Sequence, residues 1–405
     1  MPVARTFEYT VMDTAGKKRV HRIEAPNDVA VATHLRERGM VAVAIHEVNT
    51  GGLNREISFG SGIKPKDVVV MTRQLSTMVS SGLSLLRAIN ILAEQTRSAA
   101  LARVMLEIAG VIENGGTLAD GFAQHPRVFS PVIIAMIRAG ESGGFLDQVL
   151  ATVADNMESE IKLRRTVKGA MTYPVLVVAF MLIIVTVMLL VVVPTFADIF
   201  ASLDHQLPAP TLAVIALSNV MKIVGPIVIV AAIGIGVWWS KNKNLPAVRA
   251  KVDPIKLSMP LFGSLMTKVA LARFCRNFST MTRVGVPVVK ALDIVGDTSG
   301  NMVIADAVKR VKDLVTRGEP IGRAMSTESI FPPMIRQMVS VGEDAGSLDT
   351  MLGKVADFYD DEVTTATAAL TSMIEPLLII VVGAVVGGLL IALYLPIFEL
   401  SSALE

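Results

Sequence analysis

Residues 174–196 read PVLVVAFMLIIVTVMLLVVVPTF, and residues 376–398 read PLLIIVVGAVVGGLLIALYLPIF. Neither stretch contains a charged side chain, and each is 23 residues long. A helix rises by about 1.5 Å per residue, so each stretch would form a helix of roughly 34 Å, long enough to cross a bilayer with some tilt. These two stretches predict an integral membrane protein.

A third hydrophobic stretch, residues 223–239, reads IVGPIVIVAAIGIGVWW. It continues backwards through uncharged residues to Leu212, interrupted only by Lys222. A lysine near a helix end can extend its ammonium group to the interface, so Lys222 does not exclude a span. Trp238 and Trp239 stand at the other end, as interfacial anchors do. The sequence therefore predicts three transmembrane helices, at residues 173–197, 212–239 and 375–398.

Lysine and arginine are concentrated on one side of these spans. They precede the first span and follow the second, whereas segments 198–211 and 399–405 contain none. Loops rich in Lys and Arg stay in the cytoplasm. We therefore expect residues 64–172 and 240–374 in the cytoplasm together with the N-terminus, and the two segments without Lys or Arg, including the C-terminus, outside.

The chain contains an internal repeat of about two hundred residues. A first group of residues recurs 203 positions later, and a second group recurs 202 positions later. The first pairs Arg73, Ser76, Thr77, Met78 and Gly82 with Arg276, Ser279, Thr280, Met281 and Gly285; the second pairs Phe129, Pro131, Gly140, Glu141, Gly144 and Leu146 with Phe331, Pro333, Gly342, Glu343, Gly346 and Leu348. Pro174 and Pro194 likewise recur as Pro376 and Pro396. The repeat unit is a cytoplasmic domain followed by a span, and the unrepeated middle span returns the chain to the cytoplasm.

Each cytoplasmic copy has the pattern of a helical bundle. Apolar residues recur near helical spacing, and glycines such as Gly82 and Gly115 stand where the periodic segments end. In the first copy the predicted helices begin near Pro65, Leu85, Ser98, Leu118, Pro131 and Phe145, and the last leads into the membrane. We expect about six helices in each copy. The predicted fold class is thus mainly α: an integral membrane protein with two repeated cytoplasmic helical bundles and three transmembrane helices.

The first 49 residues have a different pattern. Residues 6–12, 19–24 and 41–48 have the features of strands, and residues 28–38 suit a helix that ends at Gly39. This order predicts a small N-terminal ββαβ module at residues 1–49. Residues 50–63, rich in Gly and Ser, are predicted to form a linker.

Composition and motifs exclude several classes of protein. Only 18% of the residues are charged, and the net charge of +2 provides no basic field for nucleic acid. Cys275 is the single cysteine, which excludes an internal disulfide and a Cys-cluster metal site. The sequence has no phosphate-binding loop and no metalloprotease or hydrolase motif, so we predict neither enzyme activity nor a cofactor.

Two other functional classes are alternatives. A transporter or channel component would normally place ionisable groups at mid-membrane, and the two longest spans contain none. A membrane-bound enzyme would need a catalytic constellation, which the motifs do not supply.

The most specific local motif is GESGGFL at residues 140–146, which recurs as GEDAGSL at residues 342–348. We interpret it as a structural corner between helices, formed by Gly140, Glu141 and Gly144 in the first copy and by Gly342, Glu343 and Gly346 in the second. Gly140 and Gly342 are expected to end a helix in a left-handed conformation, with the acidic residue near the N-terminus of the next helix. Two further hypotheses are a docking corner and a Ca²⁺ site built from Glu94, Glu141 and Asp147.

These features together resemble the type II secretion system F family. The resemblance rests on the two helical repeats with their corner motif, on Tyr173–Pro174 and Glu375–Pro376 at the start of the repeated spans, and on the final YLPIF at residues 394–398. It covers about residues 64–400, and the N-terminal module is similar to the one that many members carry. Glu375 departs from Tyr173 of the first copy.

The resemblance implies a non-enzymatic platform protein of the bacterial inner membrane, used in type IV pilus assembly or type II protein secretion, with a slight preference for the pilus. The implied partners are a hexameric secretion ATPase, pilins or pseudopilins, and other inner-membrane assembly proteins. Three spans are few for this task, so we expect a homo-oligomer held partly by membrane helices. Gly383, Gly387 and Gly388 form a GxxxG pattern that permits close helix approach, although glycine is also common in membrane helices.

Overall fold

The computed structural model describes residues 5–12, 18–25, 42–47, 62–201, 208–243, 245–260 and 262–403. Its contacts divide the chain into two compact units, Met1–Gly62 and Ile63–Glu405.

The N-terminal unit contains a three-stranded sheet. Strand β1 (Arg5–Met12) lies in the middle and pairs antiparallel with β2 (Lys18–Ala25) on one side and β3 (Ala42–Glu47) on the other. The helix predicted at residues 28–38 lies outside the described residues, as does the predicted linker except for its last two residues. The ββαβ order therefore stays a prediction.

The first cytoplasmic copy contributes six helices to the described residues. They are α2 (Pro65–Ser80), α3 (Leu85–Gln95), α4 (Ala99–Glu113), α5 (Leu118–Ala123), α6 (Pro131–Gly143) and α7 (Leu146–Val187). Local signals set their ends: Pro65 occupies the first turn of α2, the Ser98 hydroxyl accepts the Leu101 N–H at the start of α4, and Gly82 has a φ of 86° after α2. The number and order of these helices agree with the prediction.

The second copy repeats this plan. It comprises α11 (Phe262–Arg283), α12 (Val288–Thr298), α13 (Met302–Thr316), α14 (Ile321–Ser326), α15 (Pro333–Asp344) and α16 (Leu348–Ala403). From α12 to α14, every helix begins and ends 203 residues after its counterpart. The buried side chains of both copies form one connected hydrophobic core, in which the rings of Phe122 and Phe129 stack 3.8 Å apart.

One helix of the second cytoplasmic region, α10 (Pro246–Ser258), has no counterpart in the first copy and was not predicted. Its Asp253 is buried, pairs with Lys256 at 2.8 Å and accepts the Met302 N–H at 3.1 Å. Met302 is the first residue of α13, so Asp253 caps that helix. Helix α10 thereby anchors the chain that leaves the middle span to the second bundle.

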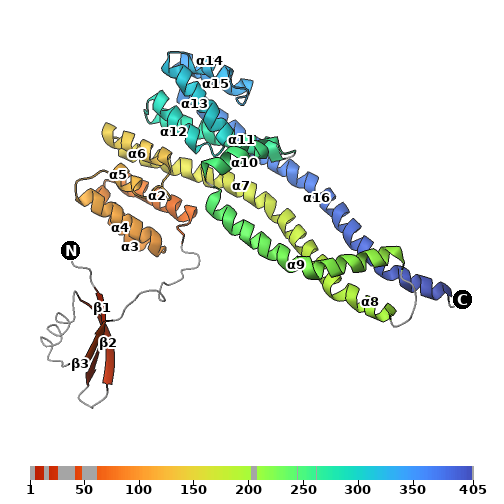
Figure 1. The fold of residues 1–405 in the computed structure, drawn as a ribbon. Helices are drawn as coiled ribbons and strands as arrows, with labels where there is room; N and C mark the ends of the chain where they lie inside the picture. Colours follow the sequence, from red (N-terminus) through yellow and green to blue (C-terminus); the bar gives the residue numbers. More distant parts are fainter. Residues whose placement is uncertain are drawn as a thin grey trace. The chain divides into compact units, whose positions relative to one another are not determined.

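Three helices among the described residues are long and apolar enough to cross a membrane, as predicted, and they lie within Leu146–Ile199, Ala209–Asn242 and Leu348–Pro396. Figure 1 shows α7, α9 (Ala209–Asn242) and α16 as the long helices of the larger unit. Helix α7 passes through Pro174 without interruption, gives way to a π-helical turn, η1 (Met188–Val192), and resumes as α8 (Val193–Ala201). With 42 residues in α7 and 56 in α16, the two helices are about 63 Å and 84 Å long. Each joins a cytoplasmic bundle to a span without a loop.

Candidate functional site at the base of the two long helices

The acidic residue of each corner motif caps a short helix of its own bundle. The carboxylate of Glu141 accepts the N–H groups of Leu118 at 2.6 Å and Ala119 at 3.0 Å, which are the first two residues of α5. Glu343 accepts the N–H groups of Ile321 at 2.9 Å and Gly322 at 3.1 Å at the start of α14 in the same way. The N–H groups of a first helical turn have no partner within the helix, and negative charge there is favourable. The carboxylates therefore tie α6 to α5 and α15 to α14, which are preceding helices and not the following ones that we had expected.

The left-handed glycines of the corners are Gly144 and Gly346, with φ values of 74° and 63°. The prediction that Gly140 and Gly342 adopt this conformation was wrong, because α6 and α15 continue through them to Gly143 and Asp344. Each of these glycines allows a close helix crossing instead. A Cβ atom on Gly140 would lie 2.7 Å from Cγ2 of Val149, and one on Gly342 would lie 3.0 Å from the Cα of Leu348. The long helix can pack at this distance only because no side chain stands there.

The Ca²⁺ hypothesis for Glu94, Glu141 and Asp147 is also wrong. The described residues contain no group of three His, Cys, Asp or Glu side chains placed to hold a metal ion. Both carboxylate oxygens of Glu141 already accept backbone N–H groups. The corner is a packing and capping device built from the backbone of two helices.

A second pair of equivalent contacts braces the long helices one to three turns further along. Arg73 on α2 pairs with Asp155 at 2.5 Å and Glu158 at 2.8 Å on α7. Arg276 on α11, 203 residues later, pairs with Asp357 at 2.8 Å and Asp360 at 2.6 Å on α16. Each arginine thus holds two carboxylates on one face of the long helix, which fixes the helix to its bundle over successive turns.

The two arginines differ in their surroundings. The carboxylates around Arg73 are largely exposed, whereas Arg276 and Asp360 are partly covered by the first copy. Burial opposes the charge of Arg276, but its hydrogen bonds to Asp360 and Asp357 keep its pKa above the usual value. Burial raises the pKa of Asp360 despite the attraction of Arg276. The second site is therefore the more sensitive of the two to loss of either partner.

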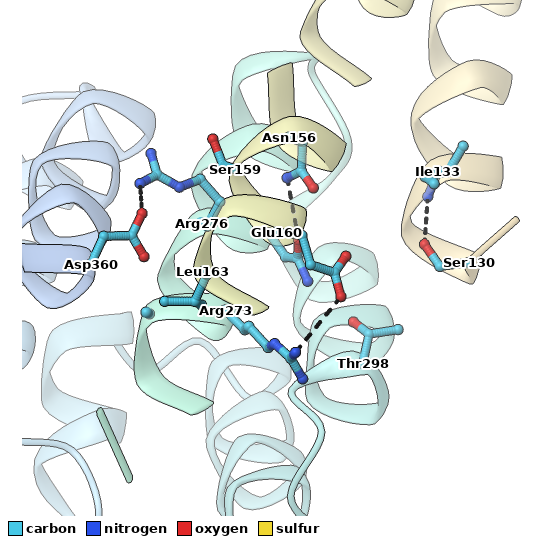
Figure 2. A pocket seen from close by; sticks show the side chains of 12 residues that line it. Ser130, Ile133, Asn156, Ser159, Glu160, Leu163, Arg273, Arg276, Thr298 and Asp360 are labelled. Atoms are coloured by element: carbon cyan, nitrogen blue, oxygen red, sulfur yellow. Dashed lines mark hydrogen bonds and ion pairs between the residues drawn. The ribbon is translucent and has the colours of Figure 1, made fainter. Parts of the chain in front are cut away.

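The two copies meet over a small polar cavity of about 190 Å³. Figure 2 shows Asn156 and Leu163 of α7 beside Arg273 and Arg276 of α11. Asn156 is buried and donates to the amide oxygen of Asn277 at 3.2 Å and to the hydroxyl of Thr280 at 3.1 Å. These bonds give the contact between the copies a defined register.

At the membrane end, the middle span supplies a hydroxyl group to each repeated helix. In η1, Val193 donates to the carbonyl of Met188, and the next residue, Pro194, has no N–H. The carbonyl of Leu189, left without these two donors, accepts the hydroxyl of Ser218 on α9. In α16, Pro396 removes the donor for the carbonyl of Ala392, which accepts the hydroxyl of Thr211 on α9.

Both hydroxyl residues are inaccessible, at 1% exposure for Ser218 and 2% for Thr211. Leu189, Val193, Leu389 and Leu393 form a small apolar cluster beside them. Backbone polar groups inside a bilayer have no water to bind, so an unpaired carbonyl there is costly. Helix α9 therefore joins the two repeated spans at their equivalent prolines.

The glycines of the third span are not used inside the chain. Gly383, Gly387 and Gly388 have no neighbouring atom within 4 Å of an added Cβ among the described residues. Their surface is open to lipid or to another chain, and the predicted packing role stays a prediction.

Comparison with known proteins decides the family. The family model for type II secretion system protein F matches residues 71–194 and again residues 274–396, and the model for the N-terminal domain of that protein matches residues 1–46. The chain belongs to the type II secretion system protein F family. The two matched segments begin 203 residues apart and end 202 residues apart, which confirms the internal repeat and both of its offsets.

Members of the family are similar to this chain over nearly their whole length. The type IV pilus assembly protein PilC of Myxococcus xanthus is 37% identical over 98% of this chain and 96% of that protein. PilC of Thermus thermophilus is 36% identical over the full length of both. The type II secretion system protein F of Pseudomonas aeruginosa is 31% identical over 98% of each. The family and the three spans establish a multi-pass membrane protein.

For this member of the type II secretion system protein F family, sequence reasoning missed several residues of the site. Arg73 and Arg276 served only to set the repeat offset, although the carboxylates that they bind recur with them. Thr211 and Ser218 were not singled out, yet their spacing of seven places them on one face of α9. Two prolines that remove donors in flanking spans could have indicated that hydroxyl groups are needed there.

The hydroxyl contacts lead to a stability prediction. Thr211→Val and Ser218→Ala should each lower the free energy of unfolding by about 0.5–2 kcal/mol, because each leaves a carbonyl unpaired in the membrane. The double variant should also loosen the contact between α9 and the repeated spans. Thermal unfolding in nanodiscs measures the first effect, and distances between spin labels on the spans measure the second.

Thr186→Val is the matched control. The Thr186 hydroxyl donates within its own helix to the carbonyl of Leu182 at 2.7 Å, a carbonyl that the backbone N–H of the helix also serves. This change should be nearly neutral. Equal melting of all three variants would show that the hydroxyl groups of α9 do not hold the spans.

Proposed function

We propose that this protein is a non-enzymatic platform of the bacterial inner membrane that transmits the work of a cytoplasmic secretion ATPase to pilins or pseudopilins. The observation that carries the proposal is the continuity of α7 and α16 from bundle to span. A movement imposed on a bundle reaches the membrane through a helix that is capped, closely packed and braced at its base. No flexible loop intervenes to absorb it.

The proposal includes an orientation. The Lys and Arg residues around the spans favour residues 64–172 and 240–374 in the cytoplasm and the C-terminus outside. The ATPase would then meet the two bundles. The spans would face the pilin subunits, because only 6% of the most hydrophobic window of the first two spans and 17% of the third are buried within the chain.

Type IV pilus assembly is the favoured system, and type II secretion is the alternative. Relatives named as type IV pilus or type 4 fimbrial assembly proteins are 33–37% identical to this chain. Relatives named type II secretion system protein F are 28–31% identical. A transporter or channel component is disfavoured by the absence of charged residues from the central parts of the two repeated spans.

A co-purification experiment tests the proposal. The full-length protein in mild detergent should retain the pilus ATPase of the same organism and should not hydrolyse ATP by itself. The type II secretion ATPase of that organism, where present, is the matched competitor. Retention of that second ATPase alone would assign the protein to secretion. ATP hydrolysis by the purified platform, or binding of neither ATPase, would overturn the proposal.

A further inference from the structure

The two copies contact each other through unlike faces. The first copy contributes a face of α7 made by Asn156, Ser159 and Leu163, here called the α7 face. The second copy contributes a face of α11 made by Arg273, Asn277 and Thr280, here called the α11 face. A contact between unlike faces of similar units does not use up its own surfaces, because each unit retains the face that its neighbour employed.

The two retained faces follow from the repeat. The offset of 202 residues converts the α7 face into Phe358, Asp361 and Thr365 on α16, here called the α16 face. The offset of 203 residues converts the α11 face into Val70, Gln74 and Thr77 on α2, here called the α2 face. All six of these residues are exposed within this chain, whereas Asn156, Leu163 and Thr280 at the covered contact are buried.

The exposed faces carry apolar side chains where the covered contact is polar. Phe358 stands at the position of Asn156 and is 46% exposed. Val70 stands at the position of Arg273 and is also 46% exposed. Val70, Gln74 and Gln95 line a surface hollow, and their counterparts Arg273, Asn277 and Thr298 line the cavity between the copies. The α2 face therefore repeats the concave half of the existing contact with a more apolar surface.

We propose that a second copy of this chain places its α16 face on the α2 face of its neighbour, and so continues the contact between the two repeats from one molecule to the next. Continuity with the contact inside the chain identifies the occupant. The geometry suits a membrane protein, because both long helices lead from their bundles into spans of the same polarity, so molecules related in this way share one bilayer. Such a head-to-tail contact closes into a ring if the rotation between repeats permits it.

This inference concerns the platform alone and stands or falls separately from the ATPase proposal. It also differs from packing through Gly383 and Gly387, since it places an interface in the cytoplasmic bundles.

Cysteine cross-linking tests it in native membranes. Cys275, the single native cysteine, is fully buried, and burial raises the pKa of its thiol, so it should not react. Gln74→Cys and Phe358→Cys are introduced into two separate copies that carry tags of different size, and both copies are expressed together. Mild oxidation should produce the mixed dimer and neither of the two like dimers.

Leu106→Cys and Val341→Cys form the control pair, because both residues are exposed but lie on neither face. They should not cross-link to each other. A like dimer of Phe358→Cys would indicate a two-fold contact and would overturn the head-to-tail arrangement. Absence of the mixed dimer, with both copies inserted and folded, would overturn the interface itself.

A charge substitution provides an independent readout. Phe358→Asp should reduce the fraction of dimers seen by native mass measurement by about tenfold or more, as expected when a buried phenylalanine is replaced by a carboxylate. The melting of the monomer should not change, because Phe358 is exposed there. An unchanged dimer fraction would contradict the proposal.

Discussion

Replacing Glu343 by alanine should lower the free energy of unfolding by about 1–3 kcal/mol, because the change leaves two N–H groups of α14 without their acceptor. The N-cap residue of α14 is Pro320, which provides no side-chain cap. Glu141→Ala should cost less, since the hydroxyl of Thr117 still accepts the Asp120 N–H at the start of α5. Glu343→Gln should fall between wild type and alanine, because it keeps one acceptor oxygen and loses the charge. Thermal unfolding of the full-length protein in detergent measures this order.

Glu319→Ala is the matched control in the same copy. Glu319 makes a surface ion pair with Arg323 at 3.7 Å on neighbouring turns, and such pairs contribute about 0–1 kcal/mol. A Glu343→Ala protein that melts like wild type but no longer supports pilus assembly would assign the carboxylate a docking role instead of a capping role.

The corner glycines should respond to alanine in the opposite sense from an ordinary helical glycine. Gly110→Ala should stabilise the protein by about 0.5–1 kcal/mol, because Gly110 lies within α4 and an added Cβ meets nothing within 4 Å. Gly140→Ala and Gly342→Ala should instead destabilise it by about 1–3 kcal/mol, since the new methyl group must push the long helix away. The same substitution thus changes sign with its surroundings, and a melting curve of each variant shows it.

A second-site change refines this test. The atoms that an added Cβ would meet at Gly140 belong first to the side chain of Val149, whereas at Gly342 the nearest is the backbone of Leu348. Val149→Ala should therefore partly rescue Gly140→Ala, and no side-chain truncation at Leu348 should rescue Gly342→Ala to the same degree. Because α7 and α16 lead into the membrane, an altered crossing should also reduce assembly in variants that still insert. Stabilisation by all three alanines would show that the corners tolerate a wider crossing.

The sequence alone determined the spans, the repeat and the order of helices in each bundle. These features depend on quantities that act locally or recur along the chain. A run of uncharged residues is costly to leave in water wherever it stands, and one shift of register explains many matched residues. Proline in a first turn and serine before a helix act within a few residues, so the ends of α2 and α4 could be predicted.

Tertiary structure decided what the motif residues do. The sequence showed a glycine and an acidic residue at each corner, but the N–H groups that Glu141 binds lie on a helix 22 or more residues earlier, and the side chain that Gly140 must accommodate lies on a different helix. Spacing along the chain contains no information about which helix will cross at that point. The left-handed conformation was consequently assigned to Gly140, while Gly144 carries it.

The same reason separates the two ends of the molecule. The prolines of the repeated spans could be seen in the sequence, but the hydroxyl groups that bind the carbonyls they leave unpaired come from the one span without a counterpart. The repeat could likewise be seen, but only the packed bundles show that its copies meet through unlike faces, with Asn156 covered and Phe358 exposed at equivalent positions. Periodicity and hydropathy determine which elements form, because they act along one chain segment. Contacts between segments decide which equivalent residue becomes a buried partner and which remains an open surface.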